Sequence, residues 1–219
     1  MPTSRRLPRG RTALPPEEVA RVQRGRLCEA MAEVVTEKGY AATSVADVLK
    51  LAGVSRQSFY QLFSSKQDCF LATYDRAAER LVARVFEALG PGGLDDGPDD
   101  PSPPLKRYER GFNAYLEALR AEWSYTRLFL VEVFAAGPAA VARRVEGQDF
   151  LVQTHADVLG AATPEALLAC RMVVAAGASL VSNAAAADRP DRLADIGREI
   201  VEYVRTLWEA GVFTAPVDA

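Results

Sequence analysis

The chain has 219 residues, of which 49% are hydrophobic and 25% are charged, as is ordinary for a soluble globular protein with room for one domain or two small ones. Its formal net charge of −3 excludes a uniformly basic nucleic-acid binder. The charge is divided unevenly, since residues 1–66 hold 11 Lys and Arg against 6 Asp and Glu, whereas residues 67–219 hold 15 against 23. A basic N-terminal part on an acidic body is expected when only that end meets phosphate.

The composition also argues against metal, redox and catalytic chemistry. Cys28, Cys69 and Cys170 are far apart and form no metal-ligand or CxxC spacing, so we expect buried, reduced thiols. A single histidine excludes a multi-histidine metal site, and no serine or cysteine lies in a nucleophile motif. We therefore expect no metal, no cofactor and no catalytic residue.

Two features bear on location. The basic N-terminus lacks the apolar run of a signal peptide, and the longest uncharged stretch, residues 172–187, is too short and too polar to favour a membrane span. We expect a cytoplasmic protein with no membrane partner.

Residues 1–14 combine four arginines with two prolines and a glycine, a composition that favours a disordered basic arm. Such an arm is either a solubilising tail or a segment that contacts the DNA backbone or minor groove, and the sequence leaves both open. A helix is predicted next, because Pro15 to Glu18 resemble a helix start and Gly39 a stop. Its apolar stripe consists of Leu27, Ala30, Met31, Val34 and Val35.

Residues 43–66, TSVADVLKLAGVSRQSFYQLFSSK, predict two short helices around a tight turn. Apolar residues at 45, 48, 49 and 52 follow helical spacing, and Ser44 with Asp47 fits a capping box. Gly53 can end the first helix in the left-handed region, and Ser55 can cap the second. Phe59, Leu62 and Phe63 would then face inward while a polar row faces outward, which is typical of a helix-turn-helix that enters the major groove.

The segment GVSRQSFYQLFSSKQDCF closely resembles the hallmark of the tetracycline-repressor (TetR) family of bacterial transcription regulators. That pattern is Gly-Val-Ser, variable residues, Tyr, x, x, Phe, x, Ser/Asn-Lys. Its positions are occupied here by Gly53, Val54, Ser55, Tyr60, Phe63, Ser65 and Lys66. The resemblance covers about residues 20–75, and Leu49, Leu51 and Cys69 depart from it in ways that concern local packing.

The resemblance implies an all-α fold of about nine helices without strands. Residues 15–66 would form the helix-turn-helix DNA-binding domain, and residues 67–219 a ligand-binding and dimerisation domain. It further implies a homodimer that binds palindromic double-stranded operator DNA, a small-molecule effector that releases it, and repression as the sign of regulation.

The DNA contacts are predicted from this arrangement. Arg56, Gln57 and Ser58 lie at the N-terminal end of the second helix, where side chains reach base edges. Hydroxyl groups at helix starts and the family's tyrosine and lysine positions fit phosphate contacts, which set register. The predicted DNA-binding residues are Thr43, Ser44, Ser55, Arg56, Gln57, Ser58, Tyr60 and Lys66.

The second part of the chain is predicted to be helical throughout. A long helix from Lys66 to about Leu89 should link the two domains, and residues 91–104, rich in Pro, Gly and Asp, predict a flexible loop. Further helices are expected at residues 106–121, 123–136, 139–159, 163–187 and 192–210.

This part carries more aromatic residues than a five-helix body needs, which indicates a ligand cavity, although core packing explains any one of them. Arg127, Glu132, His155 and Asn183 are the polar groups expected to orient a ligand, but a lone histidine is more often a surface or satisfied core residue. The predicted ligand-binding residues are Phe112, Tyr115, Phe129, Glu132, Phe150 and Asn183.

The last two helices are apolar on two sides, which indicates burial on two sides. A dimer interface is predicted, and the alternative is a fully buried internal helix. The interface residues would be Met172, Ala176, Ser179, Gly197, Val201 and Trp208.

We therefore expect a DNA-binding transcriptional regulator, most simply a repressor. Two alternatives stay open at this point: a helical enzyme or small-molecule binding protein with a vestigial helix-turn-helix, and a regulator without an effector.

Overall fold

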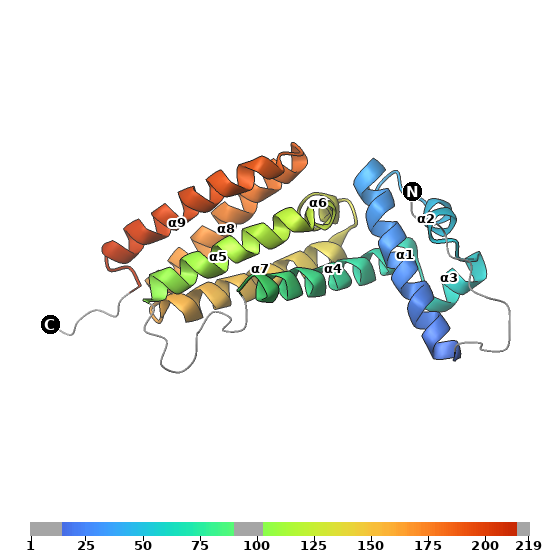
Figure 1. Cartoon of the computed structure of the whole chain (residues 1–219), viewed down its shortest axis with the longest axis horizontal. Helices are drawn as coiled ribbons and strands as arrows, with labels where there is room; N and C mark the ends of the chain where they lie inside the picture. The colour runs from blue at the N-terminus through green and yellow to red at the C-terminus, as the bar shows by residue number, and fades with distance from the viewer. Residues whose placement is uncertain (1–14, 90–102, 214–219) are drawn as a thin grey trace.

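The computed structural model describes residues 15–89 and 103–213. Within these ranges the chain forms nine α-helices and two short 3₁₀ helices and no strand, which confirms the predicted all-α fold. Helices α1 (Pro16–Lys38), α2 (Val45–Ala52) and α3 (Arg56–Leu62) form a three-helix unit at one end of an elongated molecule (Figure 1). Helix α4 (Lys66–Leu89) leaves this unit and runs into the second body.

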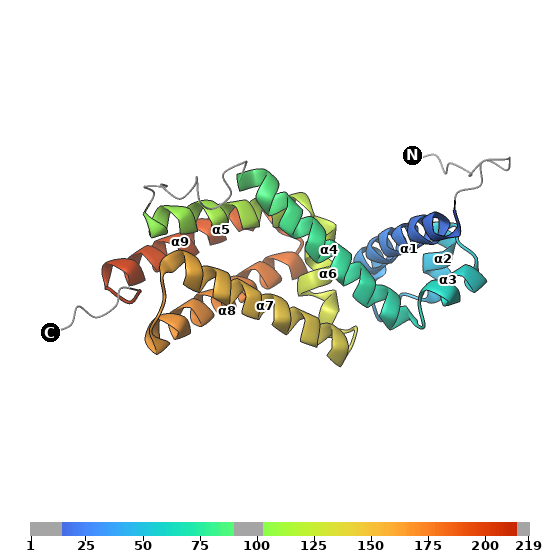
Figure 2. The same cartoon turned by 90° about the horizontal axis from the view of Figure 1, so that it is seen from below.

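The second body, called here the C-terminal body, contains helices α5 to α9. In the view from below, α7 and α8 lie on one side of it and α4 and α5 on the other (Figure 2). The predicted arm 1–14 and residues 91–102 of the predicted loop lie outside the described residues. The elements of this body are α5 (Pro104–Ala121), α6 (Trp123–Leu130), η1 (Glu132–Phe134), α7 (Pro138–Leu159), α8 (Pro164–Ala186), η2 (Pro190–Arg192) and α9 (Leu193–Glu209).

The three-helix unit is held by an apolar core whose members come from all of its helices and from the start of α4. The apolar stripe predicted on α1 is buried, and each large side chain so buried contributes about 1.5–3 kcal/mol to stability. The side chains with 2% or less of their surface exposed are Leu27, Met31, Val35, Val48, Phe59, Phe63, Cys69 and Phe70.

Local sequence accounts for the boundaries of α2 and α3. The predicted capping box is confirmed, because the Ser44 hydroxyl accepts from the Asp47 amide at 3.2 Å and the Asp47 carboxylate accepts from the Ser44 amide at 2.9 Å. The Lys38 ammonium, 2.6 Å from that carboxylate, and the Ser44 donors hold the pKa of Asp47 well below its usual range. Gly53 ends α2 at φ +61°, a left-handed conformation that glycine adopts without a steric penalty.

Helix α4 contacts both parts of the molecule. Near its middle Arg76 pairs with Glu29 of α1 at 3.3 Å. Farther along, Arg80 and Arg84 both reach Glu122, at 3.1 Å each, and the side chain of this glutamate at the α5–α6 boundary is only 10% exposed. An ion pair with a mostly buried carboxylate loses less to screening by salt than one on the open surface. These ion pairs therefore join α4 to α1 and to the α5–α6 boundary.

One predicted helix is shorter than expected. The apolar segment 123–136 forms α6 only to Leu130 and then narrows into the 3₁₀ turn η1. At this turn the Glu132 carboxylate accepts a hydrogen bond from the Tyr40 amide at 2.8 Å. A contact between residues 92 positions apart accompanies this helix end, and no local pattern announces it.

The three cysteines are buried and free, as predicted. Burial raises the pKa of the Cys170 thiol to about 11, so it is protonated at neutral pH. These thiols therefore pack as small apolar side chains.

Gly53 provides a test of this fold. We expect Gly53→Ala to lower stability by about 1–2 kcal/mol, because a Cβ in the left-handed region is strained and would lie 3.0 Å from the Arg26 guanidinium. Gly147, in the middle of α7 with nothing within 4 Å of an added Cβ, is the matched control. Gly147→Ala should raise stability by about 0.5–1 kcal/mol. Thermal unfolding followed by circular dichroism compares the two, and equal shifts would contradict the turn geometry.

Candidate DNA-binding interface

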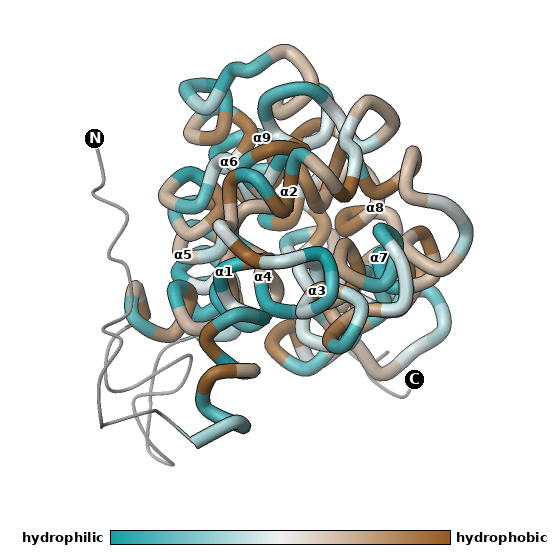
Figure 3. The backbone as a smooth tube through the Cα atoms, turned by 90° about the vertical axis from the view of Figure 1, so that its right-hand side faces the viewer, coloured by the Kyte–Doolittle hydropathy of each residue, from teal (hydrophilic) through white to brown (hydrophobic). Residues whose placement is uncertain are grey.

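The outer surface of α3 presents its polar side chains to solvent. Arg56 and Gln57 are exposed on its first turn, and the Tyr60 side chain is 51% exposed. Phe59 and Phe63 on the opposite face are buried to within 2% of their surface. Seen end-on from the three-helix unit, stretches of α3 are hydrophilic (Figure 3). The helix is thus anchored by one face and free to contact a ligand with the other.

The serines around α3 and α2 act as caps. The Ser55 hydroxyl accepts from the Ser58 amide at 3.0 Å and lies 2.9 Å from the Ser58 hydroxyl. Ser44 serves α2 in the same way. Each cap satisfies one amide of the first turn and fixes the residue at which its helix begins. Ser44 and Ser55 are exposed, whereas Ser58 is half-buried.

Thr43 and Lys66 do not lie where direct phosphate contacts require. The Thr43 side chain is buried, and its hydroxyl donates to the Gly39 carbonyl at 2.8 Å. The Lys66 ammonium donates to the Tyr40 and Thr43 carbonyls at 3.0 and 2.9 Å, and it lies 4.0 Å from the centre of the Tyr40 ring. Burial lowers the pKa of Lys66. Each residue thus holds the α1–α2 connection in place, and its phosphate contact stays a prediction.

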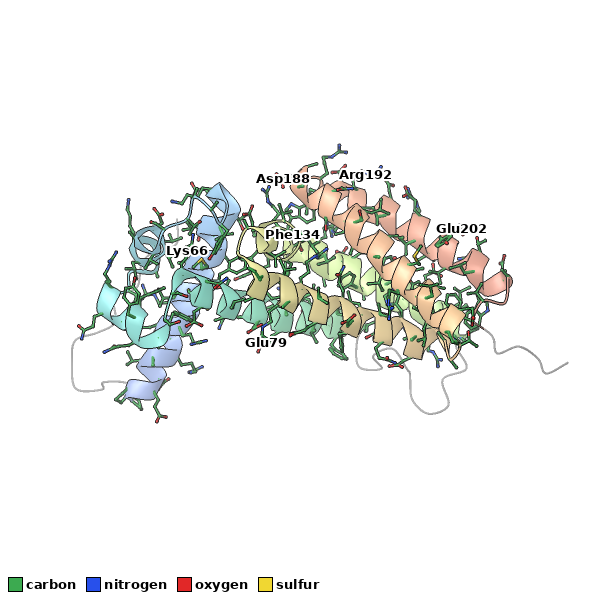
Figure 4. All side chains as sticks on the ribbon, turned by 180° about the vertical axis from the view of Figure 1, so that it is seen from behind. Lys66, Glu79, Phe134, Asp188, Arg192 and Glu202 are labelled. Atoms are coloured by element: carbon green, nitrogen blue, oxygen red, sulfur yellow. The ribbon has the colours of Figure 1, made fainter. Side chains whose placement is uncertain are left out.

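The α1–α2 connection, the end of α1 and the start of α4 all contact the C-terminal body. Besides the Glu132–Tyr40 hydrogen bond, Gln67 donates to the Ala136 carbonyl at 2.7 Å. The Thr36 hydroxyl lies 3.1 Å from the Ser124 carbonyl. Figure 4 shows Lys66 at the start of α4, beside the three-helix unit, and Phe134 at the end of the C-terminal body that faces this unit. Glu132 therefore belongs to the junction between the two parts, and its predicted role in orienting a ligand has no support from this contact.

The remaining predicted ligand residues separate into two groups. Phe112 and Phe129 are buried, and Tyr115 is half-buried on the same helix as Phe112, with the two rings stacked 6.4 Å apart. Phe150 is 65% exposed and Asn183 is also exposed, so neither lies in the core with the other three. Helical spacing placed Phe150 on α7 correctly but did not give its face.

The residues predicted for the dimer interface also divide. Met172, Ala176 and Ser179 lie on an exposed face of α8. Gly197 and Val201 are buried inside the chain, and an added Cβ at Gly197 would lie 2.9 Å from Leu116 of α5. Trp208 is half-buried and stacks on Phe213 of its own chain at 6.2 Å. Gly197 and Val201 thus belong to the face of α9 buried within this chain, whereas an interface role for Trp208 stays a prediction.

Two other kinds of binding site, a metal site and a surface pocket, can be compared with this interface. Among residues 15–89 and 103–213, no three His, Cys, Asp or Glu side chains are arranged to hold a metal ion. A surface hollow of about 350 Å³ lies at the start of α5, but charged side chains line it, and it is separate from the buried aromatic residues. Its lining consists of Lys106, Arg107, Glu109 and Arg110.

Two capped helices around a left-handed glycine, with an exposed polar face on the second, define a helix-turn-helix protein. Comparison with known proteins agrees. Residues 27–73 match the sequence profile described as bacterial regulatory proteins, tetR family. Residues 27–73 therefore carry a domain of the tetR family.

Two curated relatives illustrate the extent of the similarity. The HTH-type transcriptional activator FasR of Mycolicibacterium smegmatis is 40% identical over 67 residues, or 31% of each chain. The uncharacterized HTH-type transcriptional regulator YezE of Bacillus subtilis is 32% identical over 117 residues, which is 53% of this chain and 57% of that protein. The aligned part thus spans about a third to just over half of these relatives.

The fold extends further than the sequence similarity. The crystal structure of a transcriptional regulator from Rhodococcus sp. Rha1 superposes with a TM-score of 0.65, covering 88% of this chain and 99% of that one. Its identity to this chain is 24%, which supports a shared fold for both parts of the molecule.

The position of Lys66 yields a prediction. Lys66→Met keeps the aliphatic stem but removes the donors to two carbonyls, and we expect a loss of about 1–3 kcal/mol in stability. The salt dependence of DNA affinity should stay unchanged, because no phosphate contact is lost. Lys50→Met, on the exposed surface of α2, is the control and should change stability by less than about 0.5 kcal/mol. Unaltered stability with a salt slope shallower by about one unit would instead assign Lys66 to phosphate.

Proposed function

We propose that this protein is a homodimeric, cytoplasmic transcriptional regulator that binds a palindromic operator. Residues 15–66 form its DNA-binding domain, and residues 67–219 its ligand-binding and dimerisation domain. The observation that carries the proposal is α3 itself, with Arg56, Gln57 and Tyr60 exposed on a helix whose other face is locked into the core. The tetR-family profile matches residues 27–73, which include this helix, and two similar proteins are named as a transcriptional activator and a transcriptional regulator.

Direct recognition of bases is assigned to Arg56 and Gln57 on the first turn of α3. Arginine binds guanine, and glutamine binds adenine, through paired hydrogen bonds in the major groove. Tyr60, Ser44 and Ser55, which are all exposed, are proposed to contact the DNA backbone and so to fix the orientation of the protein. The basic balance of residues 1–66 adds sequence-independent attraction.

A second copy of the chain is the proposed partner for the exposed face of α8. This face carries Leu168 and Met172, whose side chains are 57% and 62% exposed, with Ala175, Ala176 and Ser179 beside them. Small residues allow a facing helix to approach closely, and two-fold pairing of the same face is the commonest form of assembly. Two α3 helices held one helical turn apart on DNA require such a dimer.

The apolar surface of α8 has another interpretation. By length and composition, the helix Pro164–Ala186 is able to cross a membrane. Its most apolar stretch has a mean hydropathy of 1.5, and a third of that stretch is buried in the protein. That is weak evidence, because core helices of soluble proteins meet the same criterion. Packing of α8 against α6, α7 and α9 favours the dimer interpretation.

Repression is the proposed sign of regulation. Occupying an operator blocks transcription with no surface beyond the DNA-binding helices and the dimer face. The relative from Mycolicibacterium smegmatis is named an activator, but its similarity covers only 31% of each chain, so its sign of regulation is not transferred to this protein. A reporter gene with the operator in its promoter distinguishes the two signs.

The effector is proposed to act through the junction. A ligand shifts an equilibrium only by its differential affinity for two states, so it must favour a dimer whose α3 helices are wrongly spaced. Phe129, whose ring meets Tyr74 of α4 edge-on at 4.6 Å, connects the C-terminal core to the helix shared by both domains. A regulator without effector and a binding protein with a vestigial helix-turn-helix are the rival functions.

The first test concerns DNA. The wild-type protein should bind random duplex DNA in a salt-dependent manner, and a selected operator more tightly. Arg56→Ala should cost about 1–3 kcal/mol on the operator and relax specificity at one position. Fluorescence anisotropy measures both, with Lys106→Ala at the far end of the molecule as the control. Equal losses on random and operator DNA would remove Arg56 from base recognition, and no binding to either would leave the vestigial alternative.

The second test concerns the dimer. Met172→Glu places a charge on the apolar face of α8, where burial without a partner is costly. We expect dissociation to monomers in sedimentation velocity and a matching fall in operator affinity. Val145→Glu, on the exposed side of α7 with 48% of the residue exposed, is the control and should stay dimeric. A fully dimeric Met172→Glu protein would exclude this face.

A further inference from the structure

Two buried polar groups without partners lie together in the C-terminal body. Tyr108 of α5 is 4% exposed, and its hydroxyl has no hydrogen-bond partner in the described protein. The same holds for the buried Nε2 atom of His155 on α7. The two rings meet edge-on with centroids 5.1 Å apart. Buried donors and acceptors are almost always paired, because leaving them unpaired is costly, so two such groups side by side indicate a binding function.

The hydrogen-bonding roles of the pair follow from their neighbours. His155 Nδ1 lies 2.8 Å from the Leu151 carbonyl, and a carbonyl only accepts, so Nδ1 carries the proton. Nε2 is therefore an acceptor, and burial lowers the pKa of His155, which keeps the ring neutral. Burial raises the pKa of Tyr108, so its hydroxyl stays a donor. One donor and one acceptor are available at one place.

The surroundings of the pair are aromatic and apolar. Phe112 stacks on Tyr108 at 5.8 Å and meets His155 edge-on at 6.3 Å, and Tyr115 continues the stack at 6.4 Å. These three residues of α5 follow helical spacing and form one row, with Gly177 of α8 close enough that an added Cβ would lie 4.0 Å from the Phe112 ring. A polar pair at one end of an aromatic row is the usual composition of a small-molecule site.

We propose that Tyr108 and His155 bind the hydroxyl group of a neutral alcohol or phenol whose apolar part lies along Phe112 and Tyr115. The proposal rests on the proposed function, in which the C-terminal body binds the effector, and names the chemical class of that effector. The Tyr108 hydroxyl donates to the ligand oxygen, and the ligand hydroxyl donates to His155 Nε2. A carboxylate has no proton for Nε2, and an ether satisfies Tyr108 alone. A single hydroxyl oxygen satisfies both groups.

The experiment uses matched pairs of probes with the full-length protein and no DNA. Phenol and 1-hexanol are compared with their methyl ethers, anisole and 1-methoxyhexane, and with benzoate, by ligand-observed NMR titration. Each alcohol should bind about tenfold more tightly than its ether, because the ether leaves Nε2 unpaired. His155→Phe should remove this difference and leave ether binding unchanged. Tyr108→Phe should weaken both alcohol and ether, and Tyr203→Phe, at an exposed position on α9, should weaken neither.

A second readout separates ligand recognition from a structural role. Tyr108→Phe removes an unpartnered hydroxyl, so the melting temperature of the ligand-free protein should stay the same or rise. A clear fall would mean that the hydroxyl is bonded to an internal water, and it would overturn the proposal. Equal affinity for alcohols and ethers, or no binding of either alcohol, would overturn it as well.

Failure of this site and failure of the proposed function are distinguishable. Alcohols that bind through Tyr108 and His155 without changing operator affinity support the site and reject the effector role. A protein that binds no duplex DNA rejects the regulator and leaves the ligand result intact. Operator release by phenol or 1-hexanol in wild type, lost in His155→Phe, would support both.

Discussion

The backbone of Tyr40 is the point on which the arrangement of the two parts depends. Its amide donates to Glu132 of the C-terminal body at 2.8 Å, and its carbonyl accepts from Lys66 at the start of α4 at 3.0 Å. Its ring lies against the Lys66 ammonium and meets Phe70 edge-on at 4.9 Å. Charge-assisted hydrogen bonds are stronger than neutral ones, and here they hold both sides of one residue. The segment that leads from α1 into α2 and α3 is therefore fixed by both neighbouring elements.

Helix α4 extends this constraint into the C-terminal body. Its ion pairs to Glu122 and the contact between Tyr74 and Phe129 join it to α5 and α6. Helix α6 and the turn η1 are therefore joined to the α1–α2 connection by two sets of contacts, one through α4 and one through Glu132. Packed interfaces of this kind switch between discrete arrangements and do not deform continuously, which suits a two-state regulator.

The two parts of the molecule expose side chains of different kinds. The three-helix unit buries its aromatic residues and exposes arginine, glutamine and tyrosine on α3. The C-terminal body instead leaves leucine and methionine exposed on α8. Exposed apolar patches of this kind are typical of surfaces that bind another protein. One part is thus suited to a charged polymer and the other to an apolar, self-complementary contact. The buried pair of Tyr108 and His155 lies in the second part, on other helices.

Several features of the fold could be predicted from the sequence because they depend on neighbours a few positions apart. The Ser44–Asp47 capping box, the Ser55 cap and the left-handed Gly53 involve one to four residues, and the apolar stripe of α1 repeats within two turns. The helix-turn-helix and most helix boundaries follow from such local signals. The family resemblance rested on the same segment.

Only the tertiary structure decided where the longer side chains end. Lys66 and Tyr40 are 26 positions apart, and Glu132 and Tyr40 are 92, so no spacing rule connects them. Periodicity gave two apolar sides to α9 but could not tell burial against α5 from burial against a second chain, and Gly197 proved to face α5. The open nitrogen of His155 was likewise undecidable, because a histidine has two hydrogen-bonding atoms and the partner of each is set by packing. Sequence determined the local backbone, whereas long-range contacts selected which buried polar groups are paired inside the protein and which are not.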